Sequence, residues 1–139
     1  MHSIKRRRSG QSLVEFALVV PILIALMVGI MEFGWLAKNT LQLSNAVREG
    51  ARTASMGGTT TAIAQKVQQR AVGITVSVTC TFSKDNSTYT PLGDNAGFNT
   101  APEGALIRVT ALGTHRSLTG LIPVLRQRKI VVNAEFGRE

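Results

Sequence analysis

The longest apolar stretch of the chain covers residues 13–31, where nineteen positions hold a single charge, that of Glu15. As a helix, this stretch would span about 28 Å, close to the hydrocarbon core of a bilayer. The remaining residues are too polar to bury a helix that is apolar all round. The pattern therefore favours a membrane-spanning segment over the buried helix of a soluble protein.

Helix-compatible residues continue beyond the apolar stretch, without proline, as far as Gly57 and Gly58. Two sets of positions recur at seven-residue spacing and give one small, moderately apolar stripe: Leu36, Leu43 and Gly50, with Thr40, Val47 and Ala54. We predict one helix over residues 12–56, about 68 Å long, whose first half lies in lipid and whose second half projects and packs against a body. Pro21 lacks an amide donor and is predicted to kink the helix within the membrane.

The outer end of the membrane segment carries candidate anchors. Trp35 and Lys38 lie where an interfacial anchor would sit. Glu32 follows the apolar run, close to Trp35, and we expect its charge to be dispensable.

Beyond the long helix, the period of the apolar positions changes. Residues 61–72 place Ile63, Val67 and Ala71 at helical spacing, which predicts a second, short helix. Residues 84–104 are rich in Asn, Asp, Gly, Thr and Pro and are predicted to form a long surface loop. Three segments alternate apolar and polar side chains, as half-buried strands do: residues 74–82, 105–113 and 129–136. The fold class is thus α+β: a long N-terminal helix, a short second helix and a small three-stranded antiparallel sheet.

The net charge is +8, and half of it comes from one run near the N-terminus: Lys5, Arg6, Arg7 and Arg8. By the positive-inside rule, these cations hold the N-terminus in the cytoplasm, which places the body outside. The rest of the chain holds twelve Lys and Arg against eight Asp and Glu, without a basic stripe interleaved with aromatic residues. The composition therefore does not indicate a nucleic-acid partner.

The residues that carry most enzyme chemistry are scarce. Histidine occurs twice, as His2 and His115, and Cys80 is the lone cysteine. No catalytic triad, metal-ligand spacing or phosphate-cradling glycine loop can be placed around them. We therefore expect neither catalysis nor a bound metal or cofactor. Cys80 is expected to be an apolar strand side chain, with a disulfide between chains as the alternative.

Three interpretations compete for the N-terminus. A Sec signal peptide would need a shorter apolar run and a small-residue cleavage site, whereas residues 29–39 offer no A-x-A sequence and Glu15 interrupts the run. An uncleaved signal anchor explains the cations and the length but gives Glu15 no role. The third interpretation takes the basic run, Gly10 and Glu15 together as a processing signal.

This N-terminus, KRRRSG followed by QSLVEF, resembles the processing site of class III signal peptides of type IV pilin-like proteins. The resemblance implies that a prepilin peptidase cuts between Gly10 and Gln11 on the cytoplasmic side. Residues 1–10 would then be a cleaved leader, and Glu15 would be the fifth mature residue, where these pilins carry their glutamate. The order of Glu15 and Phe16 is similar to that of the Flp/Tad subclass.

Further stretches, NAVREGARTAS and VVNAEFGRE, resemble the TadE-like family of minor pilins or pseudopilins of tight-adherence pilus systems. The resemblance implies a single-pass inner-membrane precursor, with the long helix over residues 11–56 and a small extracytoplasmic α+β domain over 57–139, that takes part in pilus assembly and adhesion. The implied partners are the prepilin peptidase, a Flp-type major pilin, other TadE/TadF-like minor pilins and the inner-membrane assembly platform. The alternative is an uncleaved single-pass protein whose outer domain scaffolds an envelope complex or binds a ligand.

The presence of a charged side chain, Glu15, within the apolar stretch also requires a physical explanation. A carboxylate within a membrane segment costs about 2.5–3.5 kcal/mol on insertion scales, so it usually has a partner. Cleavage after Gly10 would create a positive amine at Gln11, and the family pairs that amine with the glutamate of a neighbouring subunit. Glu15 would then set the stagger between subunits. The alternative is that Glu15 reaches the lipid headgroups of its own membrane.

Overall fold

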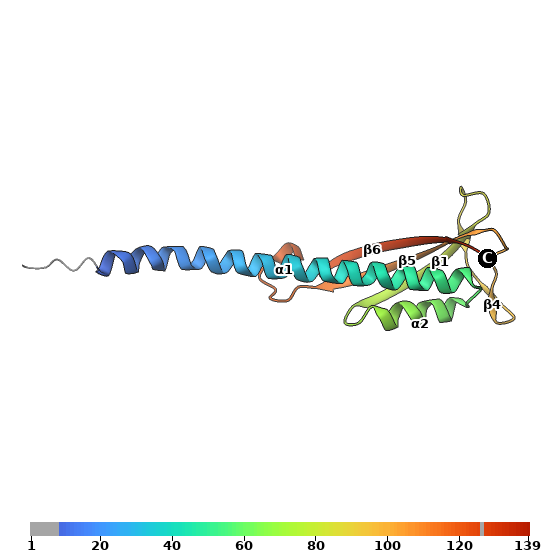
Figure 1. Cartoon of the computed structure of the whole chain (residues 1–139), viewed down its shortest axis with the longest axis horizontal. Helices are drawn as coiled ribbons and strands as arrows, with labels where there is room; N and C mark the ends of the chain where they lie inside the picture. Colours follow the sequence, from blue (N-terminus) through green and yellow to red (C-terminus); the bar gives the residue numbers. More distant parts are fainter. Residues whose placement is uncertain (1–8, 126) are drawn as a thin grey trace, which may run out of the picture.

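The computed structural model describes residues 9–125 and 127–139 as a long helix with a small body packed along its second half (Figure 1). Helix α1 spans Ser9–Ser55 and α2 spans Thr60–Arg70. The longer strands are β1 (Thr75–Ser83), β5 (Leu106–Arg116) and β6 (Gln127–Gly137). The short elements are β2 (Thr90–Pro91), β3 (Asp94–Asn95), β4 (Phe98–Asn99) and the 3-10 helix η1 (Pro123–Leu125).

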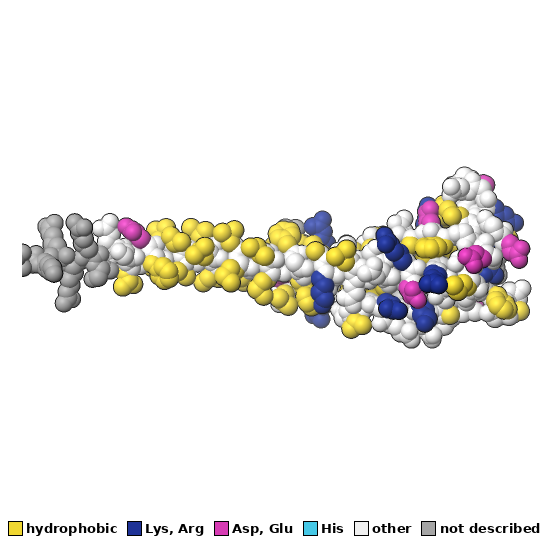
Figure 2. Space-filling model, in the orientation of Figure 1, with side chains coloured by type: hydrophobic (Ala, Val, Ile, Leu, Met, Phe, Trp, Pro, Cys, Tyr) yellow, Lys and Arg dark blue, Asp and Glu magenta, His cyan; other side chains and the backbone are white. Residues whose placement is uncertain are grey.

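Helix α1 is continuous over its 47 residues and passes through Pro21 without a break. The prediction of a single long helix is confirmed, and a kink at Pro21 stays a prediction. Its first half stands alone and its side chains are exposed, which gives the apolar shaft of Figure 2. Its second half lies in the core, where the predicted stripe is buried: Leu43, Val47 and Ala54 are fully buried, with Ala46 and Ala51 beside them.

The three predicted strands pair antiparallel, β1 with β5 and β5 with β6, as expected. The sheet nevertheless has four strands, in the order β2-β1-β5-β6, so the prediction of three was wrong. The extra strand β2 is two residues long and lies at an edge, where Pro91 is tolerated because an edge strand can leave one side unpaired. The hairpin of β3 and β4 also lies within the predicted loop. Elements this short leave no periodicity in the sequence.

One face of the sheet carries the core. On β5, Ile107, Val109 and Ala111 are fully buried and pack in one cluster with α1 and α2. The opposite face is open: Val131 on β6 is 63% exposed, whereas its neighbour Ile130 is buried. The body is thus two layers, the pair of helices on one side and the sheet on the other (Figure 1).

The carboxyl end of α1 is closed by residues distant in sequence. Gly57 takes a φ of +88°, which favours glycine and ends the helix. The Asn99 carboxamide donates to the carbonyl oxygens of Ala54 (2.8 Å) and Gly58 (3.0 Å), and Arg138 Nη1 donates to that of Ser55 (3.0 Å). The carbonyls of Ala54 and Ser55 are among those that a helix end leaves free, and these donors satisfy them. Strand β4 and the residue that follows β6 are therefore fixed to the end of α1.

Two glycines of α1 give a matched test of the packing. A Cβ at Gly50 would lie 2.5 Å from Val67 Cγ2 of α2, and the β-branched Val67 has little freedom to move away. A Cβ at Gly34 would meet nothing within 4 Å. We expect Gly50→Ala to lower the free energy of unfolding by about 1–3 kcal/mol through overpacking. Gly34→Ala should be neutral or stabilising by up to about 1 kcal/mol through helix propensity.

Thermal unfolding of the full chain in detergent, followed by circular dichroism, measures both variants. Equal melting temperatures for the two would contradict the close approach of α1 and α2 at Gly50.

Candidate functional site at the exposed helix and its junction with the body

The predicted processing site lies in the first turn of α1. Gly10 and Gln11 are exposed, and a Cβ at Gly10 would meet nothing within 4 Å. The backbone N–H groups of a first helical turn have no partner within the helix, so this turn opens more easily than the turns that follow. The bond between Gly10 and Gln11 is thus not covered by any other described part of the chain. The cations Lys5, Arg6, Arg7 and Arg8 lie outside the described residues.

Glu15 stands one helical turn beyond Gln11 and on the same side of α1. The Gln11 carboxamide Nε2 donates to Glu15 Oε1 at 3.2 Å, and both side chains are exposed. Among the described residues, Glu15 makes no ion pair, so its charge is met here by a neutral amide. The next residue, Phe16, is also exposed. The structure therefore brings Gln11 and Glu15 together and leaves Phe16 free for another surface.

The shaft of α1 presents apolar side chains on every side. The exposed large side chains run from Leu13 to Phe33 (Figure 2). Within the described residues, α1 is the one helix long and apolar enough to cross a membrane, and its most apolar window has no buried part. Apolar surface of this extent marks a membrane or protein partner. Gly29 and Gly34 have open space where a Cβ would be, so the fold of a single chain does not require glycine there.

The shaft and the body meet at Glu32, whose side chain is fully buried. The backbone N–H of Leu118 donates to Glu32 Oε2 at 3.0 Å, and that of Thr119 donates to Oε1 at 2.6 Å. The Thr119 hydroxyl donates to Oε1 as well. The expectation that the charge of Glu32 is dispensable was wrong, because this carboxylate binds the segment between β5 and β6 to the helix.

A second buried polar contact lies two turns further along α1. The Asn39 carboxamide donates to His115 Nδ1 at 3.0 Å, and both side chains are buried. With Nδ1 accepting, the ring proton is on Nε2, which has no hydrogen-bond partner among the described residues. His115 is thus a buried side chain that fixes β5 against α1.

The spacing of residues along α1 could have indicated that Glu32 and Asn39 are buried. Glu32, Leu36, Asn39 and Leu43 follow one another at i, i+4, i+7 and i+11, which is one face of a helix. Two polar side chains on the apolar face of a helix are buried with it and need hydrogen-bond partners. The sequence does not identify those partners, because Leu118 and Thr119 are more than eighty residues away.

Cys80 lies on the face of β1 that packs against the core and is half-buried. This agrees with the expected apolar strand side chain. Burial, with a smaller contribution from the negative charge of Asp94, raises the pKa of the Cys80 thiol to about 11. The thiolate is the reactive form, so Cys80 reacts poorly near neutral pH.

A comparison with protein families matches residues 10–52 to the model described as TadE-like protein. The match begins at the predicted cleavage site and covers almost all of α1, so the resemblance drawn from the sequence is confirmed. No curated protein and no solved structure matches the chain.

Removal of the Glu32 carboxylate should loosen the segment between β5 and β6. In Glu32→Ala the N–H groups of Leu118 and Thr119 lose their acceptor, and a hydrogen bond to a charged group at such a part-buried site contributes about 1–3 kcal/mol. We expect amide hydrogen exchange at these two positions to accelerate by about 5- to 150-fold, and trypsin to cut faster after Arg116. Glu49→Gln, on the same helix, is the control and should leave both rates unchanged. Unchanged exchange in Glu32→Ala would show that the carboxylate does not hold this segment.

The raised pKa of Cys80 predicts a specific pH dependence. A thiol whose pKa rises from 9.0 to about 11 holds on the order of a hundredfold less thiolate at neutral pH. The rate of maleimide labelling should therefore climb tenfold per pH unit until about pH 11. A rate that levels off near pH 9 would show that the thiol is not affected by its surroundings.

Proposed function

Because residues 10–52 are TadE-like, we propose that the protein is a minor pilin or pseudopilin of a tight-adherence (Flp/Tad) pilus. It is made as a membrane-anchored precursor and processed by a prepilin peptidase. The observation that carries the proposal is the exposed first turn at Gly10, followed one turn after Gln11 by a carboxylate at the start of a bare apolar helix. The chain acts as a structural subunit and not as an enzyme.

The charge distribution supports one orientation. Lys5, Arg6, Arg7 and Arg8 precede the apolar shaft and hold the N-terminus in the cytoplasm. The cut after Gly10 is then made on the cytoplasmic side, and the body lies outside the inner membrane. The proposed partners are the peptidase, a Flp-type major pilin, other TadE/TadF-like minor pilins and the assembly platform.

Processing changes the electrostatics of the helix start. The cut places a positive amine at Gln11, where the positive end of the helix dipole makes a cation unfavourable. A carboxylate near this end is favourable for the same reason, and Glu15 is one turn away. Within a single chain, one oxygen of Glu15 accepts a hydrogen bond from the neutral Gln11 carboxamide. We propose that on assembly Glu15 pairs with the Gln11 amine of the adjacent subunit, which fixes the stagger between subunits because an unpaired charge in a low-dielectric core is costly.

The shaft suits close packing of helices. Small residues at a helix surface let two backbones approach, and Gly29 and Gly34 are such positions with open space around them. The body is carried on the same unbroken helix, so packing of the shafts would place the bodies in a fixed array.

Processing is tested at Gly10. The peptidase must accept the backbone before the cut bond closely, so a long side chain there should exclude it. We expect Gly10→Leu to accumulate as a precursor that retains residues 1–10, resolved by intact mass of the membrane-extracted protein. Gly29→Leu, the same change within the shaft, should be cut normally. If Gly10→Leu is processed at the normal rate, Gly10 is not the recognition residue.

Assembly is tested at Glu15. The neutral amide of Glu15→Gln is less costly to bury than the carboxylate, and the leader and Gly10 are unchanged. We therefore expect the variant to be processed, stable and retained in the membrane, but not to support piliation, as counted by electron microscopy. Glu15→Asp, which reaches less far, should be intermediate.

Glu103→Gln, in an exposed loop, is the matched control and should leave piliation unchanged; Glu32 cannot serve because it is structural. Pili at normal density in Glu15→Gln cells would contradict the pairing of Glu15 with the amine.

A further inference from the structure

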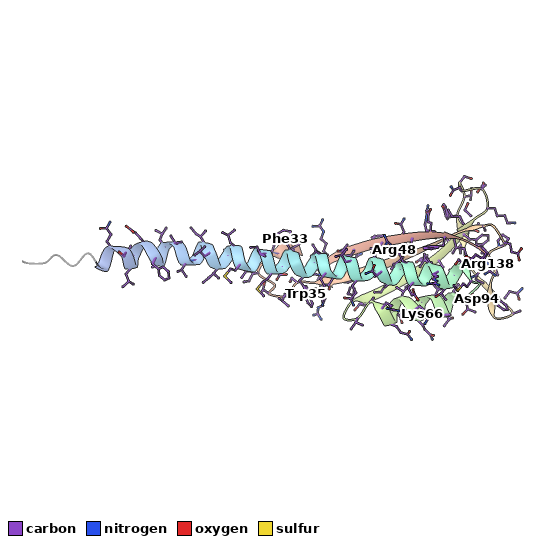
Figure 3. The ribbon with its side chains drawn as sticks, viewed as in Figure 1. Phe33, Trp35, Arg48, Lys66, Asp94 and Arg138 are labelled. Atoms are coloured by element: carbon purple, nitrogen blue, oxygen red, sulfur yellow. The ribbon has the colours of Figure 1, made fainter. Side chains whose placement is uncertain are left out.

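The segment that joins β5 to β6, residues 117–125, lies against α1 at the outer end of the apolar shaft. Glu32 binds the backbone of Leu118 and Thr119, and Leu125 at the end of η1 is buried. The segment therefore sits at the level of Phe33 and Trp35 (Figure 3). Glu32, which binds the segment, is the first residue after the nineteen-residue stretch, 13–31, that matches the thickness of a bilayer core.

Two large apolar side chains of this segment face away from the protein. Leu121 is 69% exposed and Leu118 is 51% exposed, although both are large and apolar. On α1 at the same level, Met31 and Phe33 are exposed as well. The shaft and the segment therefore both expose large apolar side chains near the place where the shaft meets the body.

Positive charge borders these apolar side chains on the side of the body. Arg116, Arg128 and Lys129 occupy the last rungs of the β5–β6 ladder and are exposed. Lys38 lies over the Trp35 ring, 4.3 Å from its centre. Residues 112–131 and 33–48 contain no Asp or Glu. Figure 2 shows Lys and Arg side chains gathered where the shaft meets the body.

We propose that the β5–β6 segment, residues 117–125, is a second membrane-contact element, which inserts Leu118 and Leu121 into the outer lipid surface of the bilayer that α1 spans. Apolar side chains backed by cations are the pattern of elements that lie in a membrane interface, and Trp and Lys are the usual anchors at that depth. The cations meet anionic lipid phosphates, as a basic patch next to a membrane does. The inference rests on the proposed membrane anchorage of α1.

The role of Glu32 follows from this placement. A carboxylate at this depth is costly unless it is paired, and three hydrogen-bond donors from the segment satisfy it. The hydrogen bonds hold the segment to the helix, so the body cannot swing away from the bilayer surface. A second copy of the chain could cover the same apolar side chains instead of lipid. The experiment that follows distinguishes these two outcomes.

Three single-cysteine variants of the full chain test the proposal, each in a Cys80→Ser background and labelled with an environment-sensitive fluorophore. Leu121→Cys probes the segment, Leu23→Cys probes the shaft, and Phe98→Cys probes the far end of the body; all three positions are exposed, so folding should be preserved. The labelled proteins are reconstituted in vesicles of phosphatidylcholine and phosphatidylglycerol, with doxyl-labelled lipid as the quencher.

We expect the probes at Leu23 and Leu121 to be quenched severalfold by the doxyl lipid, and the probe at Phe98 to be unaffected. If Leu23 is quenched and Leu121 behaves as Phe98 does, the segment lies in water and the inference is overturned, while the membrane anchor stands. The inference would also be overturned if the Leu121 probe is shielded from water but not quenched, and if this shielding increases with the protein-to-lipid ratio. A second copy of the chain would then cover the segment. An unquenched Leu23 would instead overturn the membrane anchor itself.

Discussion

Every part of the molecule depends on α1 being one continuous helix, although its first half and its second half have different surroundings. Over its first half, the helix exposes apolar side chains in all directions, and over its second half the stripe around Leu43 and Val47 forms the centre of a core. No loop separates the two halves, so the position of the shaft determines the position of the body. The hydrophobic effect explains both halves. Among the described residues, nothing covers the apolar side chains of the shaft, which therefore favour a partner outside the chain, whereas the body buries the stripe against α2 and the sheet.

Two carboxylates of α1, Glu15 and Glu32, lie at the two ends of the apolar shaft and have different surroundings. Glu32 is fully buried, and its oxygens accept hydrogen bonds from the segment between β5 and β6. Glu15 is exposed, and its contact is the neutral amide of Gln11. Glu32 is satisfied within the fold, whereas Glu15 makes no ion pair with any residue that the structure describes. This difference fits a structural role for Glu32 and an assembly role for Glu15.

Much of the fold follows from periodicity. The long helix, the short helix and the three long strands were predicted because each repeats its apolar positions over enough residues to be recognised. The two-residue strand β2 was missed because it is set by pairing with β1, not by its own side chains. At the site, Gly10, Gln11 and Glu15 could be named from local sequence alone. The burial of Glu32 could not, because its donors come from residues 118 and 119, far along the chain.

We propose that the mature helix begins at Gln11, with a new amine one turn before Glu15. The most direct measurement is N-terminal sequencing of the unaltered protein, extracted from the membranes of cells that contain a prepilin peptidase and of cells that lack it. We expect Gln11 as the first residue in the former and Met1 in the latter. Met1 as the first residue in both would contradict it and would favour an uncleaved membrane anchor.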